Sequence, residues 1–319
     1  MNESRRVLKN TVWLFSATLI SALSDVVLFV LIARYLGPEQ LGIFSFLYAI
    51  ISILTVFSNL GLDTLIIRDI ARENDKAPSF FSNIFILKII MSLISMFVLV
   101  GILHWMNYTE IVVRLGALFS MIIVLKAVLS LNDAFFEAFE RFEFMGALKI
   151  LYSLMVVGII WICLQFIVNL FGIVLVMILA SSLCVILGWI LLQRRMFPIK
   201  ISINPDKWKS LLKEAYPFVF ASFMGVMYAK TDILMLSKMV GNDAVGVYSA
   251  AYKIVNAYGI FPSILVMALF PLLSRRYKEA EGSIDKISNH MMRFLLIIGV
   301  PMVIFCTMES EKIIYLLYG

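Results

Sequence analysis

The stretch TVWLFSATLISALSDVVLFVLIA, residues 11–33, holds a single charged side chain, Asp25, in an otherwise largely apolar run. About 20 predominantly apolar residues are enough to cross a bilayer as a helix. The run is too long for the core of a signal peptide, and no small-residue cleavage site ends it. It therefore predicts a membrane helix that is retained.

Runs of this kind recur along the whole chain. Of its 319 residues, 62% are hydrophobic and 15% charged, whereas a soluble domain carries about a quarter charged residues. The composition predicts an all-α polytopic membrane protein with about nine transmembrane helices. The expected spans are residues 11–33, 41–60, 80–103, 115–131, 145–168, 170–192, 215–236, 247–273 and 294–308.

The basic residues alternate between the two sides of these spans. One set of loops holds 19 Lys and Arg, the opposite set holds 4, and the remaining 4 lie within spans. Such an excess marks the cytoplasmic side, so we expect a multi-pass protein of the cell membrane with a cytoplasmic N-terminus. The net charge of +6 is then a topology signal. We expect membrane lipid and no nucleic acid as a partner.

The longest basic loop, residues 193–214, divides the chain. Asn204-Pro205-Asp206 is typical of a helix start, and the Trp, Leu and Lys residues after it predict a short amphipathic helix on the inner leaflet. We expect a six-helix lobe over residues 1–195, a basic linker over 196–214, and a partial lobe over 215–319 with three helices and the start of a fourth.

An internal repeat supports this division. Residues 37–48 (GPEQLGIFSFLY) and 241–252 (GNDAVGVYSAAY) share the pattern G-x4-G-[IV]-[FY]-S-x2-Y, and an acidic residue precedes each copy inside a span. Six spans separate the copies, which predicts parallel repeats with the transport path between two bundles. The first glycine of each copy permits a tight turn, and the second permits close helix packing.

The chain resembles the polysaccharide-biosynthesis flippases of the O-antigen type, within the multidrug/oligosaccharidyl-lipid/polysaccharide exporter superfamily. The resemblance is carried by Asn10-Thr11-Val12-Trp13, by residues 34–45 (RYLGPEQLGIFS), by Gly61-Leu62-Asp63 through Arg68, and by residues 270–275 (FPLLSR). It implies two six-helix lobes around a V-shaped central cavity. It also implies translocation of a lipid-linked oligosaccharide, on a polyprenyl (pyro)phosphate, from the cytoplasmic to the outer leaflet. Glycosyltransferases and a polymerase of a polysaccharide pathway are the expected partners.

The family usually has twelve to fourteen spans, so this chain is expected to be C-terminally short, either as a fragment or as a truncated gene product. The sequence shows no nucleophile elbow, P-loop, dinucleotide fingerprint or zinc-protease motif, and its histidines are isolated. We expect no enzymatic activity, no cofactor and no metal site. Coupling to H⁺ or Na⁺ is the expected driving force, with the cargo's own gradient as the alternative.

Six ionisable residues inside the predicted spans are the candidate substrate- or ion-binding residues, because charge at that depth is costly. The acidic members are candidates for an ion site or a cavity gate, and the lysine excess suits an anionic pyrophosphate. The alternatives are structural pairing with a neighbouring helix for the acids and snorkelling to the nearest interface for the lysines. The candidates are Asp25, Lys88, Lys126, Lys230, Asp232 and Lys253.

Three other functions compete with a flippase. A cation-coupled multidrug exporter of the same superfamily would carry intramembrane acids without this lysine excess. A membrane glycosyl- or acyltransferase would need a catalytic carboxylate pair or a histidine beside large polar loops. A non-transporting assembly partner is the third alternative, since the chain is short.

Overall fold

A computed structural model describes residues 3–163, 169–199, 203–259 and 283–318. Within these ranges all regular structure is helical. The helices are α1 (Glu3–Asn59), α2 (Leu62–Ile70), α3 (Ala77–Trp105), α4 (Glu110–Ala138), α5 (Phe142–Cys163), α6 (Leu170–Arg195), α7 (Asp206–Met239), α8 (Asn242–Tyr258), α10 (Ser283–Met308), α11 (Ser310–Tyr318) and the 3₁₀ turn η1 (Asn74–Lys76). The chain forms two compact units, Met1–Ser249 and Ala250–Gly319.

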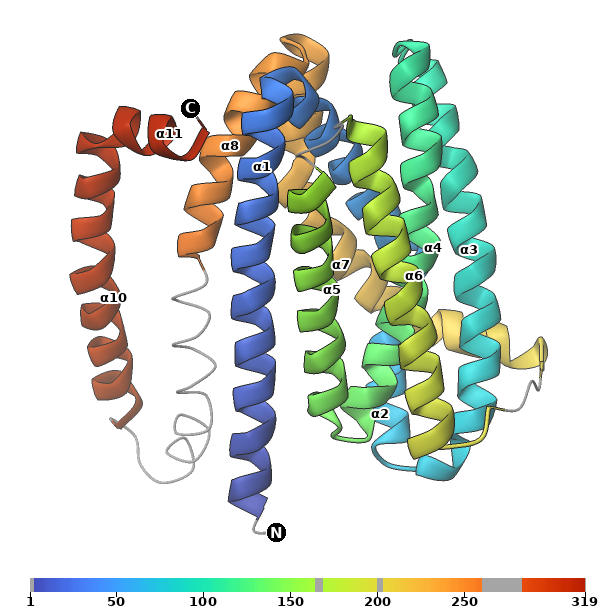
Figure 1. Ribbon diagram of the computed structural model, residues 1–319. Coiled ribbons are helices and arrows are strands. Elements are labelled where there is room, and N and C mark those ends of the chain that lie inside the picture. The colour runs from blue at the N-terminus through green and yellow to red at the C-terminus, as the bar shows by residue number, and fades with distance from the viewer. Residues whose placement is uncertain (1–2, 164–168, 200–202, 260–282, 319) are drawn as a thin grey trace. The chain divides into compact units, whose positions relative to one another are not determined.

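The first two predicted spans lie within α1, as two helical segments separated by a sharp break. Gly37 adopts φ 83° and ψ 175°, a conformation that is essentially open only to glycine. Pro38 follows it and fits the first position of the new helical segment, where no backbone N–H is required. The chain reverses here at the end of the unit opposite the N-terminus (Figure 1).

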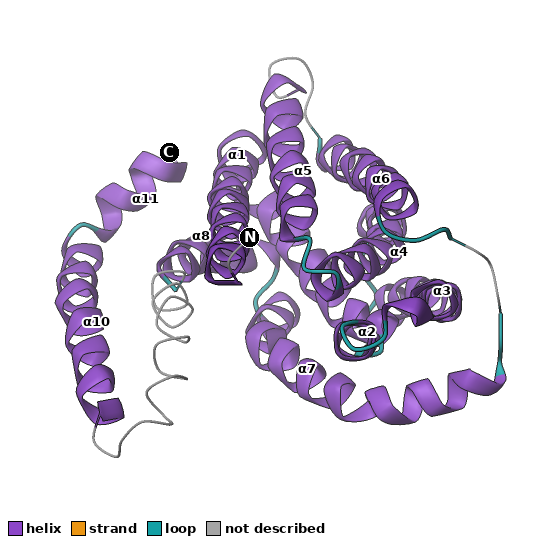
Figure 2. Cartoon of the chain, turned by 90° about the horizontal axis from the view of Figure 1, so that it is seen from below, coloured by secondary structure: helices purple, strands orange, loops and turns teal. Residues whose placement is uncertain are grey.

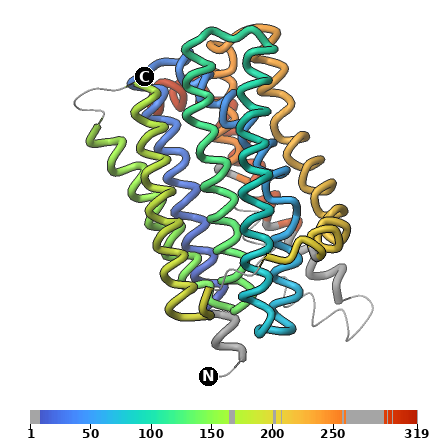
Figure 3. Tube along the Cα trace, turned by 90° about the vertical axis from the view of Figure 1, so that its right-hand side faces the viewer, coloured from blue at the N-terminus to red at the C-terminus, as the bar shows by residue number. Residues whose placement is uncertain are grey.

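Four long helices, α3 to α6, form the body of the first unit beside α1. Figures 1 and 3 show α3, α4, α5 and α6 running side by side, and α4 packs against both α3 and α6. At the end of the unit where the chain's N-terminus lies, the core between these helices is rich in aromatic rings. Phe81 contacts Phe135, Phe197 and, edge-on, Trp189. This packing fixes the register of the helices that carry the buried charges.

Helix α7 combines two predicted elements in one helix. The amphipathic segment and the seventh span are continuous from Asp206 to Met239, with Pro217 inside. The predicted capping interaction at the start of α7 is present, because the Asn204 side chain accepts a hydrogen bond from the Asp206 amide at 3.1 Å. Leu211 and Ala215 are buried, and α7 packs along α3, α2 and α1 in turn, as Figure 2 shows from below.

Both turn glycines of the repeat have the positive φ that the sequence predicts, at 83° for Gly37 and 116° for Gly241. The second glycines pack as closely as predicted, since a Cβ on Gly42 would come within 1.8 Å of the Asn242 carbonyl oxygen. The two repeats therefore meet backbone to backbone in the first unit.

Six helices of the described residues are long and apolar enough to cross a membrane, and the first of them contains two predicted spans. The fold class, an all-α polytopic membrane protein, is confirmed, whereas the number of nine spans stays a prediction. Residues 260–273 of the eighth predicted span lie outside the described residues. The last predicted span falls within α10. In the second unit α10 packs against α11, and the Tyr318 hydroxyl donates to the Ala250 carbonyl at 2.9 Å.

The compact units do not divide where the sequence predicts the lobes to divide. Helix α7 packs against α1 and α2, so the start of the predicted second lobe belongs to the same unit as the first. The lobe boundaries and the V-shaped cavity stay predictions.

Candidate functional site

Among the described residues of the first unit, the most completely enclosed charge is Lys88, in the middle of α3. Its side chain is 0% exposed. The ammonium nitrogen lies 2.5 Å from Asp63 Oδ1 and 2.8 Å from the Ser130 hydroxyl, with Asn59 Oδ1 at 3.3 Å. These acceptors come from α2, α4 and the end of α1. A buried charge is tolerable when a counter-charge and hydrogen bonds satisfy it in this way.

Further charges extend this Lys88 cluster along α4. Asp133 and Glu137 follow Ser130 by about one and two helical turns, and both are half-buried. Asp133 interacts electrostatically with Lys149 of α5 as well as with Asp63 and Lys88. The polar centre of the first unit thus joins Lys88 of α3 to three carboxylates from α2 and α4.

Asp63 is the functional candidate that the sequence analysis missed. It lies just beyond the predicted end of the second span, so it was not counted as an intramembrane charge. Its side chain is 28% exposed, whereas its partner is fully enclosed. The signal available was an acid two residues after Gly61, which has φ 64° and precedes α2, but nothing in the sequence joins this acid to a lysine on another helix.

This ion pair alters the charge balance that the sequence suggested. Lys88 is neutralised directly by Asp63, so the predicted cationic excess loses one of its four lysines. With a fully enclosed side chain, Lys88 does not present its ammonium group to a cargo in this conformation. Snorkelling, the alternative reading of this lysine, requires access to an interface that the structure does not give it.

Lys126 and Asp232 each meet a tyrosine of the repeat region. Lys126 donates to the Tyr48 hydroxyl at 3.0 Å and lies 4.3 Å from the centre of the same ring. Asp232 accepts a hydrogen bond from the Tyr248 hydroxyl and a second from the Ile233 amide. Both charges are half-buried, and each is held by a side chain that the repeat pattern supplies.

The other three predicted residues occupy different positions. Asp25 lies on an exposed face of α1, and Lys230 is half-buried in α7. Lys253 is half-buried in the part of α8 that belongs to the second unit. All three keep partners of their own. Their roles stay predictions.

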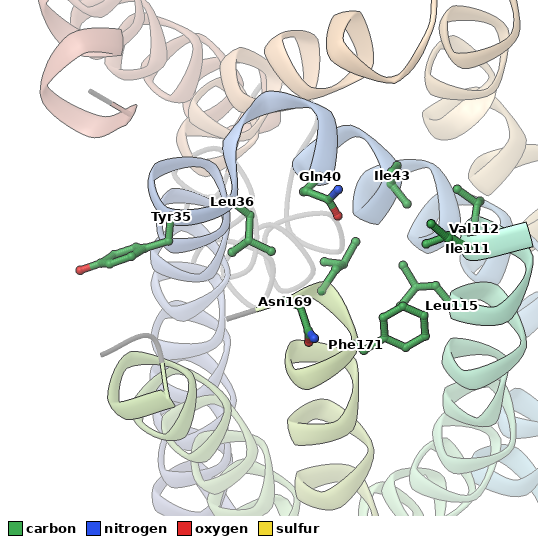
Figure 4. A pocket seen from close by; sticks show the side chains of 10 residues that line it. Tyr35, Leu36, Gln40, Ile43, Ile111, Val112, Leu115, Asn169 and Phe171 are labelled. Atoms are coloured by element: carbon green, nitrogen blue, oxygen red, sulfur yellow. The ribbon is translucent and has the colours of Figure 1, made fainter. Parts of the chain in front are cut away.

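A pocket of about 510 Å³ opens at the end of the first unit opposite the N-terminus, a size within the usual range for small-molecule sites. Figure 4 shows its lining side chains from the α1 break, the start of α4 and the start of α6. The polar members are Tyr35, Gln40 and Asn169, and the rest are apolar. Such a lining suits an amphipathic group, and none of the six predicted site residues contributes to it.

The fold and the buried charges are those of a polytopic helical membrane protein of the transporter type. Comparisons with proteins of known structure and with sequence relatives support this class. The structure resembles that of the MATE multidrug transporter DinF-BH in complex with R6G, with a TM-score of 0.72 and 14% identity over 100% of this chain and 76% of that one. At this identity the likeness concerns the fold alone.

The sequence relatives indicate the family more specifically than the fold does. The capsular polysaccharide biosynthesis protein CapF of Staphylococcus aureus is 22% identical over an alignment of 317 positions, which covers 98% of this chain and 78% of CapF. A Shigella flexneri protein described as an O-antigen transporter is 24% identical over an alignment of 332 positions, which covers 98% of this chain and 77% of that protein. The profile of the polysaccharide biosynthesis protein family matches residues 7–276. The chain belongs to this family.

Proposed function

We propose that this protein translocates a lipid-linked oligosaccharide, carried on a polyprenyl (pyro)phosphate, from the cytoplasmic to the outer leaflet of the cell membrane. The family match over residues 7–276 carries the proposal, together with the description of one relative as an O-antigen transporter. The fold supports it, because charged groups enclosed between membrane helices are typical of transport pathways. The chain is a transporter in this proposal and catalyses no bond-making step.

The proposed orientation places the N-terminus and the basic loops in the cytoplasm, where glycosyltransferases assemble the glycan. A polymerase on the outer side is the proposed receiving partner. A gradient of H⁺ or Na⁺ is the proposed driving force, with Asp25 and Asp232 as the candidate ion-binding carboxylates.

Deleting the gene in its host tests the proposal directly. The deletion is expected to abolish surface polysaccharide and to raise the amount of lipid-linked oligosaccharide on the cytoplasmic side, because the cargo is made but not moved. Normal surface polysaccharide in the deletion strain, without a second flippase gene, would contradict the proposal. Reintroducing the gene controls for polar effects on its neighbours.

A cation-coupled multidrug exporter is the second candidate, and the structural likeness to DinF-BH favours it. The two functions separate in the same deletion strain. A drug exporter predicts increased sensitivity to cationic dyes with unchanged surface polysaccharide, and a flippase predicts the reverse.

The ion-coupling part has its own test. The Asp25→Asn and Asp232→Asn variants are expected to lose the dependence of transport on the ion gradient in vesicles. Transport by both variants with an unchanged ion dependence would remove these carboxylates as coupling sites.

A further inference from the structure

The two copies of the repeat touch through glycine backbones at the end of the first unit opposite the N-terminus. A Cβ on Gly42 would lie 1.8 Å from the Asn242 carbonyl oxygen and 3.0 Å from the Gly246 amide nitrogen. A Cβ on Gly246 would lie 1.9 Å from the Pro38 carbonyl oxygen. Any side chain at either glycine would therefore force the two helix starts apart. We call this contact the glycine seam.

The seam is reciprocal. In the aligned repeat Asn242 holds the place of Pro38, just as Gly246 holds the place of Gly42. Gly42 meets Asn242, and the counterparts of these two residues, Gly246 and Pro38, meet in the same way. A two-fold axis produces such a pair of equivalent contacts. The approximate symmetry axis of the repeat therefore passes between Gly42 and Gly246, and neither side of the seam can shift without disturbing the other.

Two serines at matching positions add an independent observation. Ser45 and Ser249 follow the seam glycines by three residues, on the same helix face, and are only 3% and 4% exposed. Neither hydroxyl has a hydrogen-bond partner among the described residues, although most buried polar side-chain atoms have one. A buried unsatisfied hydroxyl costs free energy, so the closed seam carries this cost once on each side.

The contacts beside the seam are apolar packing and hydrogen bonds, including one from Lys238 to the Met106 carbonyl at 3.1 Å. A small cluster of buried apolar side chains, Ala49, Ile233 and Val245, joins α1 to α7 and α8. The Tyr108 hydroxyl and the Ser237 hydroxyl lie 2.7 Å apart. The seam thus closes the end of the unit without an ion pair among these contacts, which suits a contact that must open.

We propose that the glycine seam is the outer gate of the transport path, closed in this structure by backbone packing of the two repeats. Opening separates α1 from α8 at this end and lets water, and the hydroxyl-rich glycan headgroup as it leaves, reach Ser45 and Ser249. The proposal rests on the proposed function for the identity of the cargo. The gate itself can be tested without transport.

Thiol labelling from outside measures the opening. In a variant that lacks Cys163, Cys184 and Cys306, Ser249→Cys is labelled in intact cells with a membrane-impermeant maleimide. Adding Gly42→Ala is expected to raise the labelling rate several-fold, because the new methyl group cannot fit against Asn242 and holds the seam open. An unchanged rate in a normally inserted Gly42→Ala protein would overturn the proposal.

Gly225→Ala is the matched control, since nothing lies within 4 Å of a Cβ at Gly225. It introduces the same methyl group on α7 away from the seam, so its labelling rate is expected to equal that of the parent. An equal increase in Gly225→Ala and Gly42→Ala would assign the effect to general loosening and overturn the proposal.

A second variant decides the question if Gly42→Ala does not insert. Ser45→Ala removes an unsatisfied hydroxyl from the closed seam only, so it is expected to raise the melting temperature and slow the labelling of Ser249→Cys. A lower melting temperature, or faster labelling, would overturn the proposal. Transport is measured separately in the deletion strain. If the seam variants change the labelling rate but the deletion strain keeps its surface polysaccharide, the flippase function is refuted and the proposed gate is still supported.

Discussion

Lys88 lies in a setting that allows little substitution. An unpaired ammonium group enclosed between membrane helices is costly, and here its neutralisation depends on one carboxylate, that of Asp63. Asn59, Ser130 and the Ala127 carbonyl accept the remaining hydrogen bonds, and Ser130 also donates to Asn59 at 2.9 Å. Three helices and the end of α1 therefore meet at one nitrogen atom, and removal of the charge affects all of them.

Lys88→Met is expected to destabilise the protein by about 3 kcal/mol, at the low end of the cost of breaking a buried ion pair, because Asp63 keeps some access to water. The double variant Lys88→Met with Asp63→Asn is expected to recover most of this loss, since no charge is then left without its partner. Thermal unfolding in detergent measures both.

The control for this pair is Arg114→Gln, which removes the exposed ion pair with Glu110 on α4 and is expected to change stability by less than about 1 kcal/mol. A double variant as unstable as Lys88→Met would show that the pair does not act as a unit. Transport by a stable double variant would show that the pair serves the fold and not the transport path.

The sequence identifies such charges but not their partners. An isolated Lys or Asp in an apolar run is visible by inspection, and Lys88, Lys126 and Asp232 were singled out in this way. Their partners Asp63, Tyr48 and Tyr248 depend on how separate helices are aligned in register, which a single sequence does not encode in any local pattern. The glycine pattern is the exception, because the two copies of the repeat in the sequence identify the two segments that pack together.

Helix α7 shows how one element can serve two environments. Its first turns lie at the N-terminal end of the first unit, where the Trp208 indole donates to Asn83 Oδ1 at 3.0 Å. The Asn204 amide donates to the same oxygen at 2.8 Å. Arg68 adds an ion pair with Glu214 at 2.8 Å. These contacts hold the start of α7 to α2 and α3, while its later turns pack along α1.

Asn83→Leu is expected to release the start of α7, because two N–H donors lose their common acceptor, at a cost of about 1–3 kcal/mol. The release should appear as faster proteolysis of the segment between α6 and α7 in membranes opened to added protease. Lys209→Ala, an exposed change on the same helix, is expected to leave the cleavage rate unchanged. Equal cleavage rates in the parent protein and both variants would show that Asn83 does not hold the start of α7 in place.

Element boundaries were predicted less well than element identity, for physical reasons. Residues 11–33 and 41–60 were predicted as separate spans, and the non-helical backbone at Gly37 separates them within α1 as predicted. The boundary that differs is in α7, where the amphipathic segment and the span after it were predicted as separate elements but form one helix, because Pro217 does not end it. Local residue preference indicates where a helix weakens, and tertiary packing decides whether it stops.

All connections of the first unit that carry the basic excess lie at the same end as the N-terminus (Figure 1). They include α2 and η1 with Arg68, Arg72 and Lys76, and the start of α7 with Lys209 and Lys213. The opposite end holds the α1 break, the short α3–α4 connection and the turn at Gly241. The charge count and the folded arrangement thus assign these loops to the same two sets.

This arrangement predicts the orientation of the whole molecule. In a cysteine-free variant, Thr109→Cys at the exposed α3–α4 connection is expected to react with an impermeant maleimide in intact cells, because that end faces outward. Asp75→Cys in the exposed turn η1 is expected to react only after the cells are permeabilised, because the basic end is retained in the cytoplasm. The reverse pattern would place the N-terminus outside, and it would move the glycine seam from the outer to the inner side of the transport path.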